Sequence, residues 1–517
     1  MAFKKIINRS DMLGCLLCKN PVCSQSCPSK VEPGRLLRSI WFNNEEAASL
    51  MLPEKNPCAE CSAFCESSCI KNAGIEKDNT SCIRVPVKKL MEKLYQVRNE
   101  PHDLIPSDKS AFPRFSDIDF SCLKTDICGI PLENPFLLSS SVVASTYDMC
   151  ARAFEEGWAG ACFKTICNFP IHECSPRFSA LEGDNNSFIG FKNIEQLSDH
   201  SVEENMEIFR RLKKNYPSKF ILASIMGQNE AEWAELAEKC QNAGADAIEL
   251  NFSCPNMADG GLGSDIGQVP ELVEKLTRTA KSACKIPVIA KLTPNVANMS
   301  PAAEAALKGG ADGLAAINTI KSITGVNLHT FVSEPSVHGK SALGGYSGAA
   351  VKPIALRFIA ELASNPKLKN LHITGMGGIE NWDDAAEFIL LGSKSLQVTT
   401  AVMKYGYRII DDLKSGLALY MNQKGFKSVD EMTGLSLDSF NMSTDALERD
   451  TVLYPKFKSQ KCLGCGRCVI SCADGGHQAL SLCEDGKIRM NAKKCVGCHL
   501  CILVCPQKAI VSSGLRR

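Results

Sequence analysis

Residues 220–227 read FILASIMG, residues 230–245 read EAEWAELAEKCQNAGA and residues 247–254 read AIELNFSC. The first and third segments are short apolar runs typical of buried parallel strands, whereas the middle segment has apolar residues at helical spacing. Together they predict a strand, a helix and a second strand parallel to the first. The second strand runs into an amide, a hydroxyl and a thiol within four residues, so reactive groups follow its carboxyl end.

The same alternation of strands and helices continues along the chain. Further strand segments are IPVIAKLTP (286–294), GLAAINTI (313–320), LHITGMGG (371–378) and SLQVTTAV (395–402), with helical segments between them. Repeated units of this kind over roughly 300 residues fit a (β/α)8 barrel or a doubly wound sheet. The polar, Gly-rich or Asn-bearing strand ends favour the barrel, because in a barrel those ends build the active site.

The 27 cysteines are concentrated at the two ends of the 517-residue chain. Nine lie between Cys15 and Cys82, nine lie between Cys462 and Cys505, and the other nine are scattered through the middle. We see neither a secretory leader nor an apolar run long enough to span a bilayer, and therefore expect a cytoplasmic protein. In that reducing compartment, clustered cysteines are metal ligands or catalytic thiols rather than disulfides.

The charge composition argues against two classes of partner. The chain has 58 basic and 57 acidic residues, which gives a formal net charge of +1. No global field attracts the protein to nucleic acid or to an anionic membrane surface. We therefore expect neither nucleic acid nor a membrane among its partners.

The C-terminal cysteines repeat the bacterial ferredoxin pattern C-x2-C-x2-C-x3-C, first from Cys462 and again from Cys495. Three thiolates on a tight loop bind one face of a cubane, and the fourth ligand comes from the other run. We expect two 4Fe–4S clusters, with the ligand sets Cys462, Cys465, Cys468, Cys505 and Cys495, Cys498, Cys501, Cys472. Structural zinc is the weaker alternative, because zinc sites rarely show three cysteines at two-residue gaps.

The N-terminal cysteines are spaced less regularly. They are Cys15, Cys18, Cys23, Cys27, Cys58, Cys61, Cys65, Cys69 and Cys82. Eight ligands suffice for two more cubanes, and by the same crossover the first three share a cluster with Cys69. The second cluster takes Cys27 and, beside it, Cys61, Cys65 and either Cys58 or Cys82. Zinc is a more serious alternative at this end of the chain.

The loop NFSCPN (251–256) carries the family resemblance. It resembles the N-x-S-C-P signature of the dihydroorotate and dihydropyrimidine dehydrogenase superfamily, whose cysteine is the acid or base opposite a flavin. A lone cysteine is more often an inert core thiol, and only this context favours a catalytic role for Cys254. The resemblance to dihydropyrimidine dehydrogenases, above all the bacterial catalytic subunit, extends through nearly the entire chain in GFKNIEQLSDH (190–200), ASIMGQNE (223–230), GSDIGQ (263–268), AINTIKSITG (316–325), GYSG (345–348) and LQVTTAV (396–402).

The resemblance implies an FMN-binding barrel that reduces uracil and thymine. Carried over residue by residue, the FMN would be bound by Ser140, Lys164, Thr165, Lys291, Gly348, Gly377, Gly378, Thr399 and Thr400. The pyrimidine would be bound by Asn193, Asn251, Ser253, Asn318 and Thr319. Cys254 would protonate the ring, and a lysine near the flavin would stabilise its anionic reduced form. The N-terminal cysteine block resembles the helical cluster domain of the same enzymes and of the glutamate synthase small subunit.

The sequence has no G-x-G-x-x-G fingerprint after a strand, which predicts that the chain has no dinucleotide-binding fold. Electrons would then come from a separate FAD-containing subunit that oxidises NADH or NADPH, or from a ferredoxin. We accordingly expect a homo- or hetero-oligomer. Alternative functions are dihydroorotate oxidation, reduction of another cyclic enone or amide, and a non-catalytic electron-transfer hub. Cys254 argues against the hub, because a relay needs no proton donor at its flavin.

The predicted fold is therefore α/β, with a (β/α)8 TIM barrel flanked by two iron–sulfur domains. We expect a helical N-terminal iron–sulfur domain over residues 1–100 and a linker over residues 101–120, which are rich in Pro, Ser and Asp. The FMN-binding barrel should cover residues 121–440. Residues 441–517 should hold a second linker and a ferredoxin-like domain with two 4Fe–4S clusters.

Overall fold

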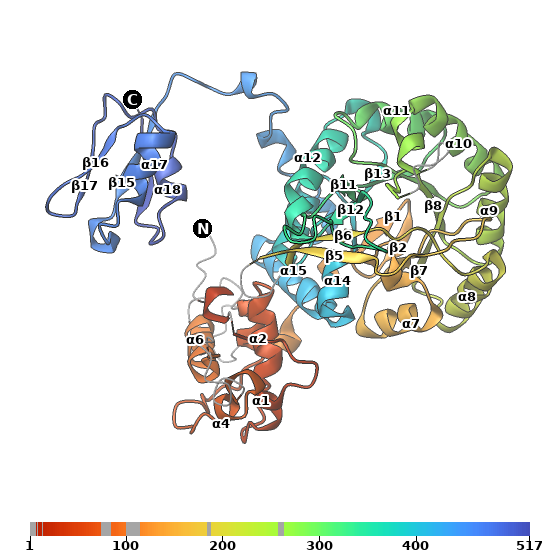
Figure 1. The fold of residues 1–517 in the computed structure, drawn as a ribbon. Helices are drawn as coiled ribbons and strands as arrows, with labels where there is room; N and C mark the ends of the chain where they lie inside the picture. Colours follow the sequence, from red (N-terminus) through yellow and green to blue (C-terminus); the bar gives the residue numbers. More distant parts are fainter. Residues whose placement is uncertain are drawn as a thin grey trace. The chain divides into compact units, whose positions relative to one another are not determined.

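The computed structural model describes residue 7 and residues 9–12, 14–73, 84–99, 114–183, 188–256 and 263–516. The chain forms two compact units, residues 1–439 and 440–517 (Figure 1). The first unit contains the N-terminal helices and the barrel, and the second contains the C-terminal cysteines. Among the described helices, none combines the length and the apolar character that crossing a membrane requires.

Eight parallel strands close into a barrel within the first unit, which confirms the (β/α)8 fold and excludes the doubly wound sheet. In their order around the barrel the strands are β3 (Phe136–Leu138), β4 (Gly160–Cys162), β7 (Phe220–Ile225), β8 (Ala247–Asn251), β9 (Val288–Lys291), β10 (Gly313–Ala316), β13 (His372–Met376) and β14 (Ser395–Val398). Every residue of these eight strands is buried, as expected for strands with core on one side and helices on the other.

Helices surround the strands as an outer ring (Figure 1). They are α7 (Tyr147–Glu156), α8 (Val202–Asn215), α9 (Glu230–Asn242), α10 (Pro270–Ala283), α11 (Ser300–Lys308), α12 (Lys352–Ala363), α13 (Trp382–Leu390) and α15 (Ile410–Lys424). Several begin with side-chain caps that satisfy backbone N–H groups, such as the capping box of Ser201 and Glu204 on α8. The strand-to-helix alternation that the sequence predicts is thus present around the whole barrel.

A small antiparallel sheet, which the sequence analysis did not predict, is built from the loops that follow β4 and β10. Its strands, in the order β11-β12-β6-β5, are β11 (Ile320–Ser322), β12 (Gly344–Ser347), β6 (Phe188–Asn193) and β5 (Phe178–Glu182). Because these loops leave the carboxyl ends of barrel strands, the sheet lies at the end of the barrel where active sites form. Asn193 and Tyr346 of this sheet line the cavity described below.

The N-terminal helices have a hydrophobic cluster of their own and also pack against the barrel. They are α1 (Val22–Gln25), α2 (Pro33–Trp41), α3 (Glu45–Leu50), α4 (Phe64–Ser67) and α6 (Val87–Asn99). The guanidinium of Arg38 on α2 contacts the carboxylate of Asp412 on α15 at 2.9 Å. The indole N–H of Trp382 on α13 donates to the backbone carbonyl of Asn43 at 2.8 Å. Of the predicted first linker, residues 101–113 lie outside the described residues, and Ile118 is buried in the barrel core.

The second unit contains two strand pairs and two cysteine-bearing helices, which matches its repeated cysteine pattern. Strand β15 (Leu453–Phe457) pairs with β18 (Ile510–Arg516), and β16 (Leu480–Leu482) pairs with β17 (Ile488–Met490). Helix α17 (Arg467–Gly475) carries Cys468 and Cys472, whereas α18 (Leu500–Leu503) carries Cys501. Each helix therefore carries the later cysteines of a ferredoxin-type run, whose first two cysteines precede the helix.

Candidate active site at the barrel mouth

A cavity with about 1100 Å³ of space outside the atoms opens at the carboxyl ends of the barrel strands. All nine residues that the sequence analysis assigns to FMN line it: Ser140, Lys164, Thr165, Lys291, Gly348, Gly377, Gly378, Thr399 and Thr400. Cys254 lines the same cavity, and so do Asn193, Asn251, Asn318 and Thr319. Residues that lie up to about half the chain apart in sequence therefore meet at one site, because parallel strands present their carboxyl ends together.

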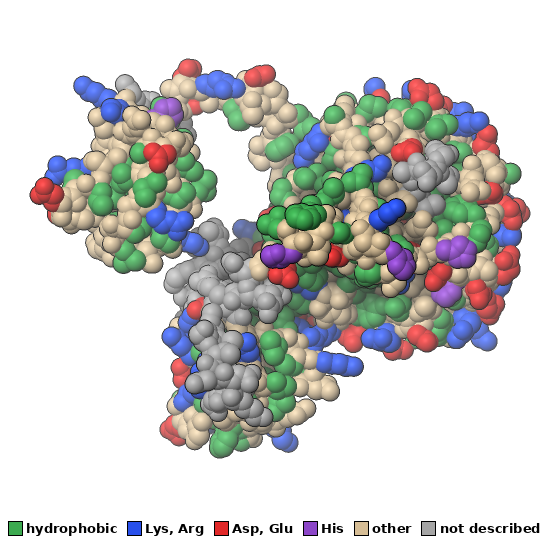
Figure 2. Space-filling model, viewed as in Figure 1, with side chains coloured by type: hydrophobic (Ala, Val, Ile, Leu, Met, Phe, Trp, Pro, Cys, Tyr) green, Lys and Arg blue, Asp and Glu red, His purple; other side chains and the backbone are tan. Residues whose placement is uncertain are grey.

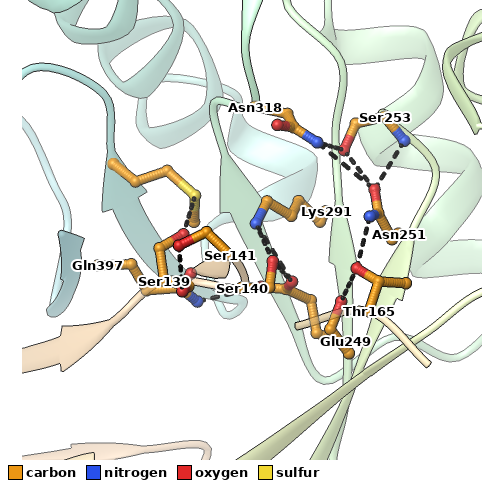
Figure 3. Close-up of polar contacts among 12 residues, drawn as sticks. Ser139, Ser140, Ser141, Thr165, Glu249, Asn251, Ser253, Lys291, Asn318 and Gln397 are labelled. Carbon is orange, nitrogen blue, oxygen red and sulfur yellow. Dashed lines mark hydrogen bonds and ion pairs between the residues drawn. The ribbon is translucent and has the colours of Figure 1, made fainter. Parts of the chain in front are cut away.

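A buried ion pair lies behind one wall of the cavity (Figure 3). Lys291, at the end of β9, is 2% exposed, and its ammonium lies 2.8 Å from the Ser140 hydroxyl and 3.3 Å from the Glu249 carboxylate. The Gln397 amide donates to the other oxygen of Glu249 at 3.0 Å. The sequence analysis missed Glu249 and Gln397, although polar residues inside the apolar strands β8 and β14 were the available signal.

The amide side chains form a connected hydrogen-bond chain (Figure 3). Asn318 donates to the hydroxyl of Ser253 at 2.8 Å, and that hydroxyl donates to the Asn251 carbonyl oxygen at 2.9 Å. Asn251 in turn donates to Thr165 at 2.8 Å. Ser253 is fully buried and is not among the residues that line the cavity. Its hydroxyl fixes the orientations of Asn251 and Asn318, which do line the cavity.

A second cluster of charged side chains surrounds Lys164. Its ammonium lies 3.3 Å from a carboxylate oxygen of Glu195 and 3.6 Å from one of Glu173, and Arg177 also contacts Glu195 at 3.3 Å. Burial raises the pKa of Glu195 above its usual value, and the Lys164 charge opposes this shift only in part. Both lysines at this cavity are thus already paired with carboxylates. The sequence analysis missed Glu195, which lines the cavity two residues after Asn193.

Cys254 is only 7% exposed. Burial raises the pKa of its thiol to about 11, in spite of a hydrogen bond to the Asn256 backbone that lowers it. The side chain of Asn256 donates to Asn193 at 3.3 Å and so ties the cysteine loop to strand β6. The thiol is consequently protonated at neutral pH and placed to donate a proton into the cavity. Residues 257–262, which continue the loop, lie outside the described residues.

Three glycines that line the cavity form a cradle. Gly348, Gly377 and Gly378 all have positive φ values, of 93°, 116° and 87°. A Cβ atom at Gly378 would lie 2.9 Å from the backbone carbonyl of Gly348, so no larger residue fits without displacement. Bare backbone of this kind lets N–H groups approach a phosphate. The glycine cradle fits the phosphate of FMN, and the part of the cavity lined by the Lys291 ammonium fits its ring.

The N-terminal cysteines fall into two groups of neighbours. Burial raises the pKa of Cys15 to about 11, and the thiols that raise it further are those of Cys23, Cys69 and Cys18. Burial also raises the pKa of Cys58, and here the neighbouring thiols are those of Cys27 and Cys61. Burial, Glu66 and then the thiols of Cys58, Cys27 and Cys61 raise the pKa of Cys65 to about 12. Cys58 therefore lies with the second group, whereas Cys82 lies outside the described residues.

Among the C-terminal cysteines, the neighbours of Cys468 agree with the crossover predicted for the first ligand set. Burial raises the pKa of Cys468, and its neighbouring thiols are Cys462 of the same run and Cys505 of the other. Backbone N–H groups donate to the sulfur of Cys472 from Ala479 and to the sulfur of Cys505 from Ala509, both at 3.3 Å. Hydrogen bonds to ligand sulfurs are typical of iron–sulfur sites.

The family model described as dihydroorotate dehydrogenase matches residues 122–421, more than half of the chain. The chain belongs to the dihydroorotate dehydrogenase family. A second model, described as a 4Fe-4S dicluster domain, matches residues 456–512. As a member of that family with an appended dicluster domain, the chain is an oxidoreductase that carries a flavin site and iron–sulfur clusters. Neither match includes residues 1–121.

Curated relatives of this family member come from both branches of the superfamily. The NAD-dependent dihydropyrimidine dehydrogenase subunit PreA of Escherichia coli is 53% identical over 362 residues, which cover 70% of this chain and 88% of the relative. The chloroplastic NADP-dependent dihydropyrimidine dehydrogenase of Arabidopsis thaliana is 37% identical, over 66% and 82% of the two chains. The catalytic subunit of dihydroorotate dehydrogenase B from Pyrococcus abyssi is 39% identical, over 61% and 99%.

Proposed function

We propose that this chain is the catalytic subunit of a dihydropyrimidine dehydrogenase, which reduces uracil and thymine to their 5,6-dihydro forms. The observation that carries the proposal is the cavity itself, where a protonated thiol and several amide side chains meet beside a flavin site. The similarity to the E. coli and A. thaliana enzymes supports the same substrate class.

The amide side chains suit a neutral pyrimidine. Asn193, Asn251, Asn318 and Thr319 line the cavity. Their donors and acceptors match the alternating C=O and N–H groups of a uracil ring. Asn251 and Asn318 are held by Ser253, so their orientations are fixed before the substrate arrives. Preorganised amides of this kind select a ring that offers the complementary pattern.

The proposed chemical step divides between the cofactor and Cys254. A bound FMN supplies the hydride that C6 of the pyrimidine accepts. Cys254 donates its thiol proton to C5, and the resulting thiolate regains a proton from water. Because burial keeps the thiol protonated at neutral pH, it is an acid over the whole physiological range. Ser140, Lys164, Thr165, Lys291, Thr399, Thr400 and the glycine cradle would bind the cofactor.

The paired lysines argue against orotate as the substrate. Orotate carries a carboxylate, which needs a cationic or multi-donor group. Of the cations that line the cavity, Lys291 is paired with Glu249, and Lys164 lies between Glu195 and Glu173. Their positive charge is therefore partly offset, which favours the uncharged ring of uracil or thymine over a carboxylate.

A panel of acceptors tests the proposed activity. The holoenzyme is assayed anaerobically with reduced viologen as electron donor and with uracil, thymine, orotate or unrelated cyclic enones as acceptor. We expect turnover with uracil and thymine and little with orotate. Turnover with orotate alone would assign the chain to dihydroorotate chemistry, and turnover with none would support a role in electron transfer.

We also propose four 4Fe–4S clusters, two in each cysteine-rich region. The N-terminal ligand sets would be Cys15, Cys18, Cys23, Cys69 and Cys27, Cys58, Cys61, Cys65, as their neighbourhoods support. The C-terminal sets are those that the ferredoxin pattern predicts. Iron analysis that accounted for only two clusters, or zinc in the N-terminal region, would contradict the N-terminal assignment.

Replacement of Cys58 distinguishes the two candidate ligands of the second N-terminal cluster. The variant Cys58→Ser should lose about a quarter of the iron, because one of four cubanes loses a thiolate. Cys82→Ser is the matched control and should keep wild-type iron. The measurement is iron and sulfide content after anaerobic purification, and the reverse pattern would assign the ligand to Cys82.

We propose that a separate FAD-containing subunit or a ferredoxin delivers electrons, so that the working enzyme is an oligomer. The E. coli relative is named as a subunit and as NAD-dependent, which supports a pyridine nucleotide as the ultimate donor. We further propose a cytoplasmic location, since no disulfide joins the cysteines that the structure describes.

The isolated chain should not use NADH. We expect that NADH or NADPH leaves the flavin oxidised in anaerobic stopped-flow experiments, whereas dithionite bleaches it in the same preparation. Rapid bleaching by NADH without an added subunit would show that the chain itself binds pyridine nucleotides and would contradict the proposed partner.

A further inference from the structure

Glu249 is a fully buried carboxylate that the proposed chemistry does not use. It lies on strand β8 between the apolar residues Ile248 and Leu250, and its exposed fraction is 0%. One oxygen accepts a hydrogen bond from Ser140 at 3.1 Å and contacts the Lys291 ammonium at 3.3 Å. The other accepts from the Gln397 amide at 3.0 Å (Figure 3). A buried carboxylate with this many polar partners contributes something other than apolar packing.

The carboxylate is ionised in spite of its burial. Burial alone would raise the pKa of Glu249, but the Lys291 charge and hydrogen bonds from Gln397, Cys162 and Lys291 lower it below its usual range. The pair with Lys291 is thus a true ion pair in a dry environment. In such surroundings, two charges 3.3 Å apart influence each other and their neighbours far more than they would in water.

Glu249 lies directly behind the cavity wall. Three of its partners, Ser140, Lys291 and Gln397, line the cavity, whereas Glu249 itself and its partner Cys162 do not. These partners come from three different strands or strand ends, β3, β9 and β14, which meet around the single carboxylate. One residue of β8 therefore fixes the positions of three groups that face the cofactor site.

We propose that Glu249 is a positioning residue that sets the reduction potential of the flavin bound in this cavity. It does so by fixing the Lys291 ammonium and by cancelling part of the positive charge that this ammonium presents to the flavin. A positive charge stabilises the anionic reduced ring, so an unopposed lysine would raise the potential and the carboxylate holds it lower. A lower potential makes the reduced cofactor a stronger donor to the pyrimidine. The inference rests on the flavin part of the proposed function and not on the identity of the substrate.

A potentiometric titration of the holoenzyme, without any pyrimidine, tests the inference. In Glu249→Gln, which keeps the shape and removes the charge, binding of the reduced flavin should strengthen at least tenfold relative to the oxidised flavin. A tenfold change corresponds to about +30 mV for a two-electron couple. Glu249→Asp keeps the charge but withdraws it from Lys291, so it should shift the potential in the same direction and by less.

Asp412→Asn is the matched control, because it makes the same chemical change at another buried ion pair. Asp412 is 2% exposed and lies 2.9 Å from Arg38, away from the cavity. The flavin reduction potential of the Asp412→Asn variant should equal the wild-type value. If Glu249→Gln yields too little folded protein, the smaller positive shift of Glu249→Asp decides the question.

Three results would overturn the inference: an unchanged or lower potential in Glu249→Gln, an equal shift in Asp412→Asn, or no shift in Glu249→Asp when it alone folds. A failure of the pyrimidine assignment leaves this measurement intact, since no substrate is present. A purified chain that binds no FMN under any reconstitution would instead remove the flavin assignment and this inference with it.

Discussion

Replacing Cys254 with alanine should slow the reoxidation of the reduced flavin by uracil by about 10²–10⁴-fold, the usual contribution of a positioned general acid. FMN content, iron content and uracil binding should stay close to wild type, because the thiol lines the cavity without holding any other side chain in the hydrogen bonds described above. Cys254→Ser should retain a little activity, since a hydroxyl is a weaker acid than a thiol. The measurement is anaerobic stopped-flow reoxidation by uracil after dithionite reduction.

The pH dependence and a second cysteine provide the controls for this result. Because the thiol is the acid and its pKa is raised to about 11, the wild-type reoxidation rate should not decline through loss of this proton until strongly alkaline pH. Cys240→Ala removes a thiol of the same kind that is fully buried between helix and barrel, and it should reoxidise normally. A near-normal rate in Cys254→Ala would mean that the thiol only packs and that another group donates the proton.

Replacing Gly378 with alanine should yield a folded chain that has lost most of its FMN. A Cβ atom there would lie 2.9 Å from the Gly348 carbonyl, from the Lys352 backbone nitrogen and from the Lys352 Cβ. Two of these are backbone atoms, one of Gly348 in the cradle and one of Lys352 at the start of helix α12, so the cradle or the helix has to move before alanine fits. We expect flavin content in the purified protein to fall by at least tenfold, while the iron content of both cysteine-rich regions stays unchanged.

The variant Gly425→Ala separates this effect from backbone strain. Gly425 ends helix α15 with a φ of +79°, close to the +87° of Gly378, but a Cβ there meets no atom within 4 Å. It pays the same conformational penalty, about 1 kcal/mol or more for a left-handed residue with a side chain, without touching the cradle. Equal loss of FMN in both variants would show that the phosphate site is not at Gly378.

The alternation of strands and helices was sufficient for the barrel, whereas most of the candidate site residues came from the family resemblance, and the cavity-lining residues Glu195 and Gln397 were missed. Polar groups after apolar strands, such as Asn251 and Thr399, lie at strand ends in any parallel barrel, so spacing along the chain already places them at one face. The exchange of the fourth cluster ligand between the two C-terminal cysteine runs was predictable for a similar reason. A cubane needs a fourth ligand from outside each tight loop.

Other features depend on how distant segments meet, and chain spacing does not carry that information. The contacts of Glu249 require the register of β8 against its neighbours and the closure of the barrel, which bring Lys291 and Gln397 to it. The hydrogen bond between Ser253 and Asn318 likewise joins segments that are distant in sequence, and the predicted contact of Ser253 with the substrate stays a prediction. Spacing also left the choice between Cys58 and Cys82 open, and the proposal of Cys58 comes from its neighbours Cys27 and Cys61 in the folded chain.

The identity of the acceptor is the central claim, and a single-turnover experiment tests it most directly. The holoenzyme is reduced with dithionite, freed of excess reductant and mixed anaerobically with uracil, while the flavin spectrum is followed and the product is identified. We predict that the flavin reoxidises and that one dihydrouracil forms for every two electrons released. A flavin that stays reduced with uracil and thymine, but reoxidises with orotate, would contradict the account.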